Sequence, residues 1–276
     1  MSDAEQYDAI IIGAGQGGMP LTTTLAGEGW RTVLIEREHV GGTCINTGCT
    51  PTKTMVASAR AAYMARRAKD YGIRTGPIAV DMQVIRQRKR DMVKSFRQSN
   101  VKRIEQSDAD LIRGEARFSG TKTLEVDLNK GDTVQLTADK IFIDTGARPR
   151  GPDLLGLDGI SYLNSTTIME LGQVPEHLLI IGGGYVGVEF AQMFRRFGSQ
   201  VTLVQRSGQL LTHEDRDVAE EVAEILRQDG IKIFLDSVPV RAGQTEDRRI
   251  QLVVHQPGEQ EKRTVSGTHL LVAIGR

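Results

Sequence analysis

The residues best suited to chemistry are two cysteines that lie close together in the chain. Cys44 and Cys49 are the only cysteines among the 276 residues, and they fall in the run Gly-Gly-Thr-Cys-Ile-Asn-Thr-Gly-Cys-Thr-Pro-Thr-Lys at residues 41–53. A disulfide between them would close so small a ring that it would stabilise the fold by only about 2 kcal/mol. The pair therefore favours a bond that is opened and closed in redox exchange over a structural staple.

A helix is predicted directly after this run, over the alanine-rich residues 54–69. A thiolate at the start of a helix is stabilised by the helix dipole, and Lys53 adds a positive charge nearby. Both effects lower the pKa of a thiol. The pattern therefore predicts a cysteine that reacts as a thiolate at neutral pH.

Two glycine-rich segments resemble each other and indicate where nucleotides would bind. Residues 10–18 read Ile-Ile-Ile-Gly-Ala-Gly-Gln-Gly-Gly, and residues 179–187 read Leu-Ile-Ile-Gly-Gly-Gly-Tyr-Val-Gly. In both copies an apolar strand runs into the turn, and a helix pattern and a second apolar strand (residues 32–35 and 201–204) follow. This is the βαβ dinucleotide-binding fingerprint, present twice. The glycines that would form the turns are Gly13, Gly15 and Gly18 in the first copy and Gly182, Gly184 and Gly187 in the second.

Within each copy the three glycines have separate physical roles. The first would allow the tight turn, the second would let the backbone approach a pyrophosphate, and the third would let helix and strand pack closely. The pyrophosphate would then lie at the positive end of the helix. Two dinucleotide sites are therefore predicted, against the alternative of glycine-rich turns in an ordinary α/β domain.

The residue that ends the second strand of each copy bears on which dinucleotide binds. In the first copy it is Glu36, and a carboxylate there accepts hydrogen bonds from ribose hydroxyls. In the second copy Gln205 takes this place and Arg206 follows. Without the carboxylate a 2′-phosphate is not repelled, and a guanidinium can bind one. The second site is therefore predicted to prefer NADPH over NADH, with a merely solvated Arg206 as the alternative.

Composition and charge exclude several classes of function. The chain is 39% hydrophobic and 25% charged, and its 35 basic and 35 acidic residues give no formal net charge, so nucleic acid is not favoured as a partner. No apolar run approaches the ~20 residues of a membrane helix, and the opening residues do not resemble a signal peptide. We therefore expect a cytoplasmic protein without a membrane partner, in which a disulfide would be catalytic or redox-sensing.

The remaining pattern predicts the elements that would position these sites. A long helix is expected over residues 81–105, with its basic residues on a solvated face, and short alternating strands over residues 110–143. The residues of that helix expected to face a core are Met82, Ile85, Met92, Val93 and Phe96. The elements expected after residue 176 are helices at 186–197 and 215–229 and strands near Lys232, Ile250 and His269. The predicted fold class is α/β, with two Rossmann-like dinucleotide-binding domains of the three-layer ββα kind at residues 1–150 and 151–276.

The cysteine run between two dinucleotide folds closely resembles the class I pyridine nucleotide-disulfide oxidoreductases, a family that includes dihydrolipoyl dehydrogenase, glutathione reductase and mercuric reductase. Thr-Gly-Ala at residues 145–147 resembles the family's Thr-Gly motif, and Ala-Ile-Gly-Arg at residues 273–276 resembles its second one. The residues of these motifs most resemble those of the mercuric reductase-like branch. That branch includes bacterial flavoproteins linked to reactive chlorine and copper stress.

The resemblance implies FAD in the first fold and a nicotinamide dinucleotide in the second. It implies that Cys49 is the sulfur beside the flavin, where its thiolate gives a charge-transfer band, and that Cys44 is the sulfur that meets substrate. Lys53 would lie near the flavin N5 and pair with Glu189, and Tyr185 would cover the nicotinamide pocket and move when the coenzyme enters. Further cofactor contacts are implied for Gly42, Thr43, Ala116 (with the backbone of residues 114–116), Thr145, Gly146 and Gly275.

The implied activity is electron transfer from NAD(P)H through flavin to the Cys44–Cys49 disulfide and on to an acceptor. Because the attacking sulfur in thiol exchange must be accessible, Cys44 is expected to be accessible. The acceptor stays open between lipoamide, a glutathione-like disulfide, Hg(II) and Cu(II), that is, a small-molecule disulfide or a metal ion. A non-catalytic thiol redox sensor and a truncated dinucleotide-binding fragment are the alternatives, although a sensor would not need two dinucleotide folds.

The chain stops at Arg276, where family members continue with the rest of the FAD domain and a dimerisation domain. We therefore expect a fragment of a larger enzyme that is active as a full-length homodimer, and that by itself holds FAD poorly. No metal site is predicted. The five histidines stand in no catalytic or metal motif and are interpreted as structural or surface residues: His39, His177, His213, His255 and His269.

Overall fold

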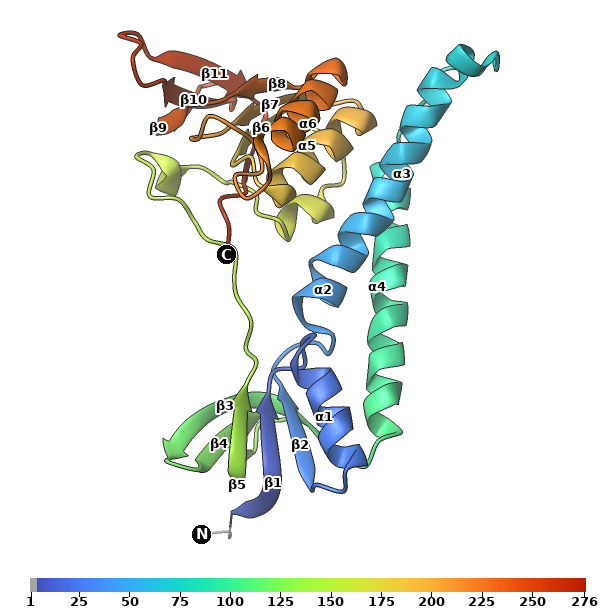
Figure 1. Ribbon diagram of the computed structural model, residues 1–276, viewed down its shortest axis with the longest axis vertical. Helices are drawn as coiled ribbons and strands as arrows, with labels where there is room; N and C mark the ends of the chain where they lie inside the picture. The colour runs from blue at the N-terminus through green and yellow to red at the C-terminus, as the bar shows by residue number, and fades with distance from the viewer. Residues whose placement is uncertain (1–3) are drawn as a thin grey trace. The chain divides into compact units, whose positions relative to one another are not determined.

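The computed structural model describes residues 4–276 (Figure 1). The chain forms two compact units. The first contains the residues up to 52 together with 89–147, and the second contains residues 53–88 and 148–276. The division passes through two helices, α3 (Cys49–Arg67) and α4 (Met82–Glu105). Each unit has its own parallel sheet and its own glycine-rich turn.

The sheet of the first unit is built from five strands joined in a closed order, β1-β2-β3-β4-β5. Strand β1 pairs in parallel with β2 and β5, and β2 pairs in parallel with β3, which gives the parallel order β3-β2-β1-β5. Strand β4 runs antiparallel to both of its neighbours. The bounds are β1 (Glu5–Ile12), β2 (Thr32–Glu36), β3 (Asp110–Gly120), β4 (Thr123–Leu128) and β5 (Thr133–Ile143).

Two of these strands are longer than predicted, because each serves two layers. Strands β3 and β5 have 11 residues each. The first part of β3 pairs with β2 and its second part with β4, and β5 likewise pairs first with β4 and then with β1. Apolar side chains of β1 and β2 face β4 and β5 across the inside of this sheet, with Ile10, Val33 and Leu136 among them. The short strands predicted over residues 110–143 were therefore wrong in length.

The other face of β1 and β2 is covered by helices. Helix α1 (Gly18–Gly27) packs there through Met19, and α4 contributes Ile104. Ile11 and Leu34 of the sheet are fully buried beneath them. The first unit therefore has helices on one side of its parallel strands and the antiparallel strands on the other.

The second unit repeats this order with its own strands. Its four parallel strands run in the order β8-β7-β6-β12, the same order as β3-β2-β1-β5. A three-stranded antiparallel sheet, β11-β10-β9, buries Leu252 and Val254 against Leu179 and Leu270 of the parallel sheet. The strand bounds are β6 (His177–Ile181), β7 (Gln200–Val204), β8 (Lys232–Phe234), β9 (Val238–Gln244), β10 (Ile250–His255), β11 (Arg263–Gly267) and β12 (His269–Val272).

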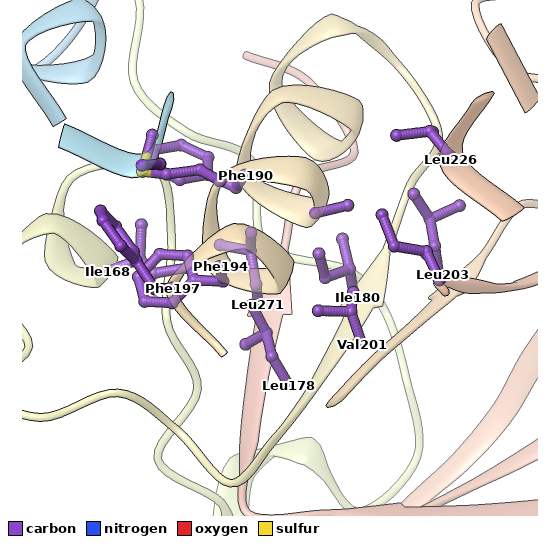
Figure 2. Close-up of a cluster of buried hydrophobic side chains, with 14 of the residues drawn as sticks. Ile168, Leu178, Ile180, Phe190, Phe194, Phe197, Val201, Leu203, Leu226 and Leu271 are labelled. Carbon is purple, nitrogen blue, oxygen red and sulfur yellow. The ribbon is translucent and has the colours of Figure 1, made fainter. Parts of the chain in front are cut away.

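Helices α5 (Tyr185–Phe197) and α6 (Arg216–Gln228) cover the opposite face of this sheet (Figure 1). Three phenylalanines at helical spacing, Phe190, Phe194 and Phe197, form the buried face of α5, and Figure 2 shows them beside the strand residues they cover. The rings of Phe194 and Phe197 meet edge to face with centroids 5.8 Å apart. The second unit is thus a three-layer ββα structure, and the predicted α/β fold class with two Rossmann-like units is confirmed.

Residues 53–88 group with the second unit because α3 packs on its core. Met55 and Ala59 are buried among the side chains of that core. The helix begins at Cys49 rather than at residue 54 as predicted. A proline within the first turn of a helix lacks only an N–H that would have no partner there, so Pro51 does not prevent this start.

The buried side of α4 differs in part from the prediction. Met82 and Val93 are buried and Ile85 is half-buried, but Met92 and Phe96 are 37% and 45% exposed. Met92 and Phe96 lie seven residues after Ile85 and Lys89, which are half-buried and buried, so helical spacing alone does not separate them from the buried side. The prediction that these two residues face a core was therefore wrong.

Short 3-10 helices connect the larger elements: η1 (Ala68–Tyr71), η2 (Leu157–Gly159) and η3 (Thr167–Glu170). Across residues 4–276, none of the helices is both long and apolar enough to span a bilayer.

Candidate functional site

The first glycine turn joins β1 to α1 and requires glycine at two positions. A Cβ on Gly13 would lie 2.2 Å from the carbonyl oxygen of Asp144, and Gly13 has φ +107°. A Cβ on Gly18 would lie 2.0 Å from the carbonyl oxygen of Gly13. A Cβ on Gly15 would meet only the carboxylate end of Asp144, at 3.3 Å. The turn is therefore tight where strand and helix meet, whereas a Cβ at residue 15 would meet no backbone atom.

Two carboxylates hold this turn. Glu36, at the end of β2, accepts hydrogen bonds from the backbone N–H of Ala14 (2.9 Å) and of Glu38 (2.7 Å). Asp144, directly after β5, accepts one from the N–H of Gly18 at 2.5 Å, at the positive end of α1. The sequence interpretation gave Asp144 no role. The parallel pairing of β1 with β5 brings the residue after β5 to the residue after β1, and no local pattern in the sequence indicates this pairing.

The cysteine loop is bound directly to the same turn. The N–H of Gly41 donates to the carbonyl of Ala14 at 2.8 Å, and the side chain of Gln16 donates to the carbonyl of Gly41. A Cβ on Gly42, which has φ +56°, would lie 2.6 Å from the Cα of Gly15. Only glycine allows so close an approach. The first dinucleotide turn and the start of the cysteine loop are therefore one assembly within the first unit.

Both cysteines lie at helix starts or within short helices, and both are free thiols. Cys44 belongs to the one-turn helix α2 (Gly42–Asn46), and Cys49 is the first residue of α3. Burial raises the pKa of the Cys44 thiol, and hydrogen bonding with Cys49 raises it further. Cys49 is exposed whereas Cys44 is only half-exposed. This order of exposure is the reverse of the one expected for Cys44 as the accessible sulfur.

Asn46, between the two cysteines, fixes the conformation of the loop. Its side-chain N–H group donates to the carbonyls of Gly42 (2.9 Å) and His39 (3.1 Å). Its carbonyl oxygen accepts a hydrogen bond from Arg97 of α4. Burial lowers the pKa of Arg97. The sequence interpretation gives neither residue a role, because it places the basic residues of this helix, Arg97 among them, on a solvated face.

Four further residues predicted to contact FAD lie at different places in the first unit. Thr43 is exposed on α2, beside Gly42. Thr145 and Gly146 are exposed and follow Asp144, at the end of the sheet that carries the glycine turn. Ala116 lies on the part of β3 that pairs with β4, and its side chain packs against the apolar interior. A contact of Ala116 with a cofactor would therefore have to come from its backbone.

The second glycine turn, between β6 and α5, has the same steric pattern. A Cβ on Gly182 would lie 2.4 Å from the carbonyl oxygen of Ala273, and one on Gly187 would lie 1.9 Å from that of Gly182. Gly184 differs, because a Cβ there would meet no atom within 4 Å. The residue precedes α5 with φ −76° and ψ −178°, which any residue adopts. The space beside Gly184 is thus open, and this cradle lies at the N-terminus of α5, where a pyrophosphate would meet the positive end of the helix.

Gln205 and Arg206, which follow β7, differ in burial and in hydrogen bonding. Gln205 is 8% exposed, and its side-chain carbonyl accepts the N–H of Gly183 at 3.0 Å while its amide donates to the carbonyl of Gln209 at 3.2 Å. Arg206 is exposed. Gly275, predicted as a cofactor contact, has φ +113° and accepts the N–H of Arg150 through its carbonyl. Gln205 therefore has a structural role, and Arg206 is the group exposed to solvent.

Two side chains of α5 have charged partners within the second unit. Lys53, on α3, forms an ion pair with Glu189, the pairing that the resemblance implies. Tyr185, the first residue of α5, is 57% exposed and donates its hydroxyl hydrogen bond to Glu214. This hydrogen bond raises the pKa of Tyr185. Glu214 had no place in the sequence interpretation.

Two of the histidines have local polar partners. His177 contacts the hydroxyl of Thr202 at 2.9 Å, and His269 contacts that of Thr268 at 3.1 Å. Burial lowers the pKa of both histidines. In the part of the chain that the structure describes, no three His, Cys, Asp or Glu side chains gather as a metal site would require.

The chain is similar to known proteins over nearly its whole length. The family model for pyridine nucleotide-disulphide oxidoreductase matches residues 7–276. Mercuric reductase from Bacillus cereus is 35% identical over 98% of the chain, and the probable pyridine nucleotide-disulfide oxidoreductase RclA from Escherichia coli is 38% identical over 98%. A solved Cu(II) complex of the HOCl-induced flavoprotein disulfide reductase RclA matches 98% of the chain with a TM-score of 0.83 and 36% identity.

The chain spans about half the length of the curated relatives it matches: 42% of the mercuric reductase and 57% of RclA. It also covers 57% of the solved RclA chain. Members of the matched family are FAD-dependent and use NAD(P)H.

Proposed function

Because the chain belongs to the pyridine nucleotide-disulphide oxidoreductase family, we propose that it carries the hydride-accepting and disulfide part of an NAD(P)H-dependent flavoprotein oxidoreductase. FAD would bind at the first glycine turn, in the domain of residues 1–150, and the nicotinamide coenzyme at the second, in the domain of residues 151–276. A bound FAD would supply the ring that takes the hydride and passes on two electrons. The Cys44–Cys49 disulfide would receive them.

The observation that carries this proposal is the joining of the cysteine loop to the first glycine turn. Gly41 donates to Ala14, and Gly42 lies so close to Gly15 that a side chain at residue 42 would collide with the Gly15 backbone. A dinucleotide held at that turn would therefore have the cysteine loop as its immediate neighbour. A structural disulfide or a general thiol sensor would have no need of this arrangement.

The cysteines would act by thiol–disulfide exchange. The reduced pair forms when the Cys44–Cys49 bond takes up two electrons and protons. The Cys44 sulfur then attacks one sulfur of a disulfide acceptor, a mixed disulfide forms, and the other half of the acceptor leaves as a thiolate. Attack of Cys49 on the Cys44 sulfur releases the second half and restores the bond. Burial raises the pKa of Cys44, and attack by this sulfur requires that the thiol proton be removed by a base.

Lys53, Glu189 and Tyr185 would serve the coenzyme side of the reaction. Glu189 holds the Lys53 ammonium on the second unit, and a lysine beside a flavin ring stabilises negative charge that develops there. The coenzyme would be NADPH in preference to NADH, because Arg206 is exposed next to a buried, uncharged Gln205.

The acceptor would be a small-molecule disulfide or a metal ion. Relatives named mercuric reductase and dihydrolipoyl dehydrogenase support these two classes, as does the Cu(II) complex of RclA. The full-length protein would be a homodimer, without nucleic-acid or membrane partners. A cytoplasmic setting agrees with a single cysteine pair that is used for catalysis.

The absorption spectrum of the flavin tests the two sulfur roles. In anaerobic titrations with NADPH, Cys44→Ser is expected to keep a long-wavelength charge-transfer band, since Cys49 remains beside the flavin, and to lose disulfide reduction. Cys49→Ser is expected to lose the band. If Cys49→Ser keeps the band instead, the two roles are reversed, as the greater exposure of Cys49 would then suggest. Bound flavin that NADPH cannot reduce would contradict the proposed function.

A further inference from the structure

The loop that follows β7 folds back onto the second glycine turn. This returning loop, residues 206–214, is bound to the turn by the N–H of Leu211, which donates to the carbonyl of Gly183 at 2.9 Å. Gln205 makes a second connection, since it accepts from the N–H of Gly183 and donates to Gln209 within the loop. The turn and the returning loop are therefore held together by the backbone and by a buried amide.

The far end of the returning loop is fixed as well. Leu211 is buried and has φ +47°, a left-handed conformation that an ordinary side chain adopts only at a cost in free energy. The N–H of Glu214 donates to the carbonyl of Leu211 at 2.8 Å, and the side chain of Gln209 donates to the carbonyl of Glu214 at 3.1 Å. The backbone of Glu214 is thus tied to the loop from two sides.

The carboxylate of this fixed residue accepts the hydroxyl of Tyr185. Tyr185 follows Gly184 directly, at the point where the free space for a pyrophosphate begins, and its ring is more than half exposed. More than half of this side chain is therefore not covered by neighbouring residues. The hydrogen bond to Glu214 is therefore what ties the ring across from α5 to the returning loop.

We propose that Glu214 is a positioning residue for Tyr185: it latches the ring over the second dinucleotide site, and the coenzyme must break this latch to enter. The proposal rests on the proposed function, because it takes the second turn as the coenzyme site. Coenzyme binding then breaks the hydrogen bond from Tyr185 to the Glu214 carboxylate, and this loss weakens the affinity. Weakening the latch should make coenzyme binding tighter, whereas removal of a residue that touched the coenzyme would make binding weaker.

A double-mutant cycle with NADP⁺, measured by calorimetry on the full-length protein, tests the latch. Glu214→Ala and Tyr185→Phe each remove the hydrogen bond, so each should lower the Kd about fivefold, and the double variant should bind no tighter than either single one. Glu220→Ala, which removes an exposed carboxylate of α6, is the matched control and should leave the Kd unchanged.

The ionisation of the phenol provides a readout that a merely structural role of Glu214 would not move. The phenol of Tyr185, taken as the difference between the original protein and Tyr185→Phe, should titrate at lower pH in Glu214→Ala, because the carboxylate that raises its pKa is gone. Unchanged or weaker NADP⁺ binding in Glu214→Ala, or additive effects in the cycle, would overturn the latch while leaving the proposed function intact. If the original protein does not bind NADP⁺, the proposed coenzyme site itself is wrong.

Discussion

The two glycine turns share one framework and differ in what is attached to it. In both units the residue after the first glycine donates its N–H to the side chain that ends the second strand: Ala14 to Glu36 and Gly183 to Gln205. In both, the carbonyl of that same residue accepts an N–H from the loop that follows, at 2.8 Å from Gly41 and 2.9 Å from Leu211. The same backbone groups are therefore hydrogen-bonded in both turns, although the side chains at the ends of the second strands differ.

The differences lie at the positions that would meet a ligand. A carboxylate, Glu36, ends the strand of the first copy and an amide, Gln205, that of the second. Asp144 accepts the N–H of Gly18 in the first copy, and the residue at the corresponding backbone position of the second is Ala273. The comparison teaches that the two turns share one backbone framework, and that they differ in the side chains carried by the strand ends and by the loop after the second strand.

The loop that contains Cys44 and the loop that contains Glu214 show this difference most clearly. Cys44 follows Gly41 at the same spacing as Glu214 follows Leu211. One copy therefore presents a thiol where the other presents a carboxylate. Gln16 and Tyr185, at matching positions of the two turns, each reach toward the loop of their own copy, to Gly41 and to Glu214.

The largest expected effect tests the shared framework. Gly187→Ala should lower the free energy of unfolding of the second unit by about 3 kcal/mol, because the new Cβ would lie 1.9 Å from the carbonyl oxygen of Gly182. Urea denaturation followed by circular dichroism measures this. Gly184→Ala is the matched control, since its Cβ meets nothing, and it should change stability by less than about 0.5 kcal/mol.

The same control variant should affect binding. A methyl group in the cradle beside α5 should weaken NADP⁺ binding by about tenfold, or ~1.4 kcal/mol. Equal stability losses for the two alanine variants would show that the close contact at Gly187 is not the one described here.

The coenzyme preference of the second turn provides the next test. Arg206→Ala should weaken NADP⁺ by about tenfold, because a guanidinium–phosphate contact is lost, and should change NAD⁺ binding less than about twofold. Equilibrium titrations with both coenzymes measure the difference, and Arg227→Ala, at an exposed position of α6, is the control. Equal losses for both coenzymes would remove the 2′-phosphate argument.

The carboxylate that distinguishes the first turn should have a smaller effect. Asp144→Asn keeps an oxygen that accepts the N–H of Gly18 but removes a negative charge from the end of α1 where a pyrophosphate would lie. FAD should therefore bind about fivefold tighter, or ~1 kcal/mol. Apoprotein titration with FAD measures the Kd, with Asp132→Asn as the control at an exposed position. Weaker binding would mean that Asp144 itself contacts the cofactor.

The smallest expected effect is a pH dependence of the stability of the second unit. Burial lowers the pKa of His177 and His269 in the folded state, so at low pH the unfolded chain binds protons that the folded unit does not. Their contribution to stability is complete above the ordinary histidine pKa of about 6.5 and is lost as the pH falls below it. Thermal unfolding at a series of pH values should show a drop in Tm below this point that is smaller in His269→Asn. An equal drop in that variant would assign the loss to other groups.

The elements that the sequence predicted well are those with strong local patterns. Two examples are the apolar strands that run into glycine turns and helix α5 with its regularly spaced phenylalanines. The residues within each of these elements are enough to predict it. The start of α3 at Cys49 was missed, because Pro51 and three threonines do not look helical although the first turn tolerates them. Met92 and Phe96 were assigned to a core for their apolar character, but the direction of burial along α4 depends on which elements pack against it.

The candidate site was only partly visible in the sequence. Cys44, Cys49 and the glycines stand in motifs that local spacing defines. Asp144, Arg97 and Glu214 were missed, because each acts on a residue far away in the chain: on Gly18, Asn46 and Tyr185. Such contacts depend on strand order and loop path. A single aspartate, arginine or glutamate carries no local pattern that indicates them.

The proposed function requires that electrons from a coenzyme at the second turn reach the cysteine pair beside the first turn. Since Cys44 and Cys49 are the only cysteines of the chain, counting its thiols before and after reduction measures this directly. The oxidised, FAD-loaded protein should show no thiol from this chain that reacts with a chromogenic disulfide after denaturation. One equivalent of NADPH added without oxygen should yield two such thiols per chain, and none in Cys49→Ser beyond its single permanent one. If NADPH reduces the flavin and no new thiol appears, electrons do not pass from the flavin to the cysteine pair, and the proposed function is contradicted.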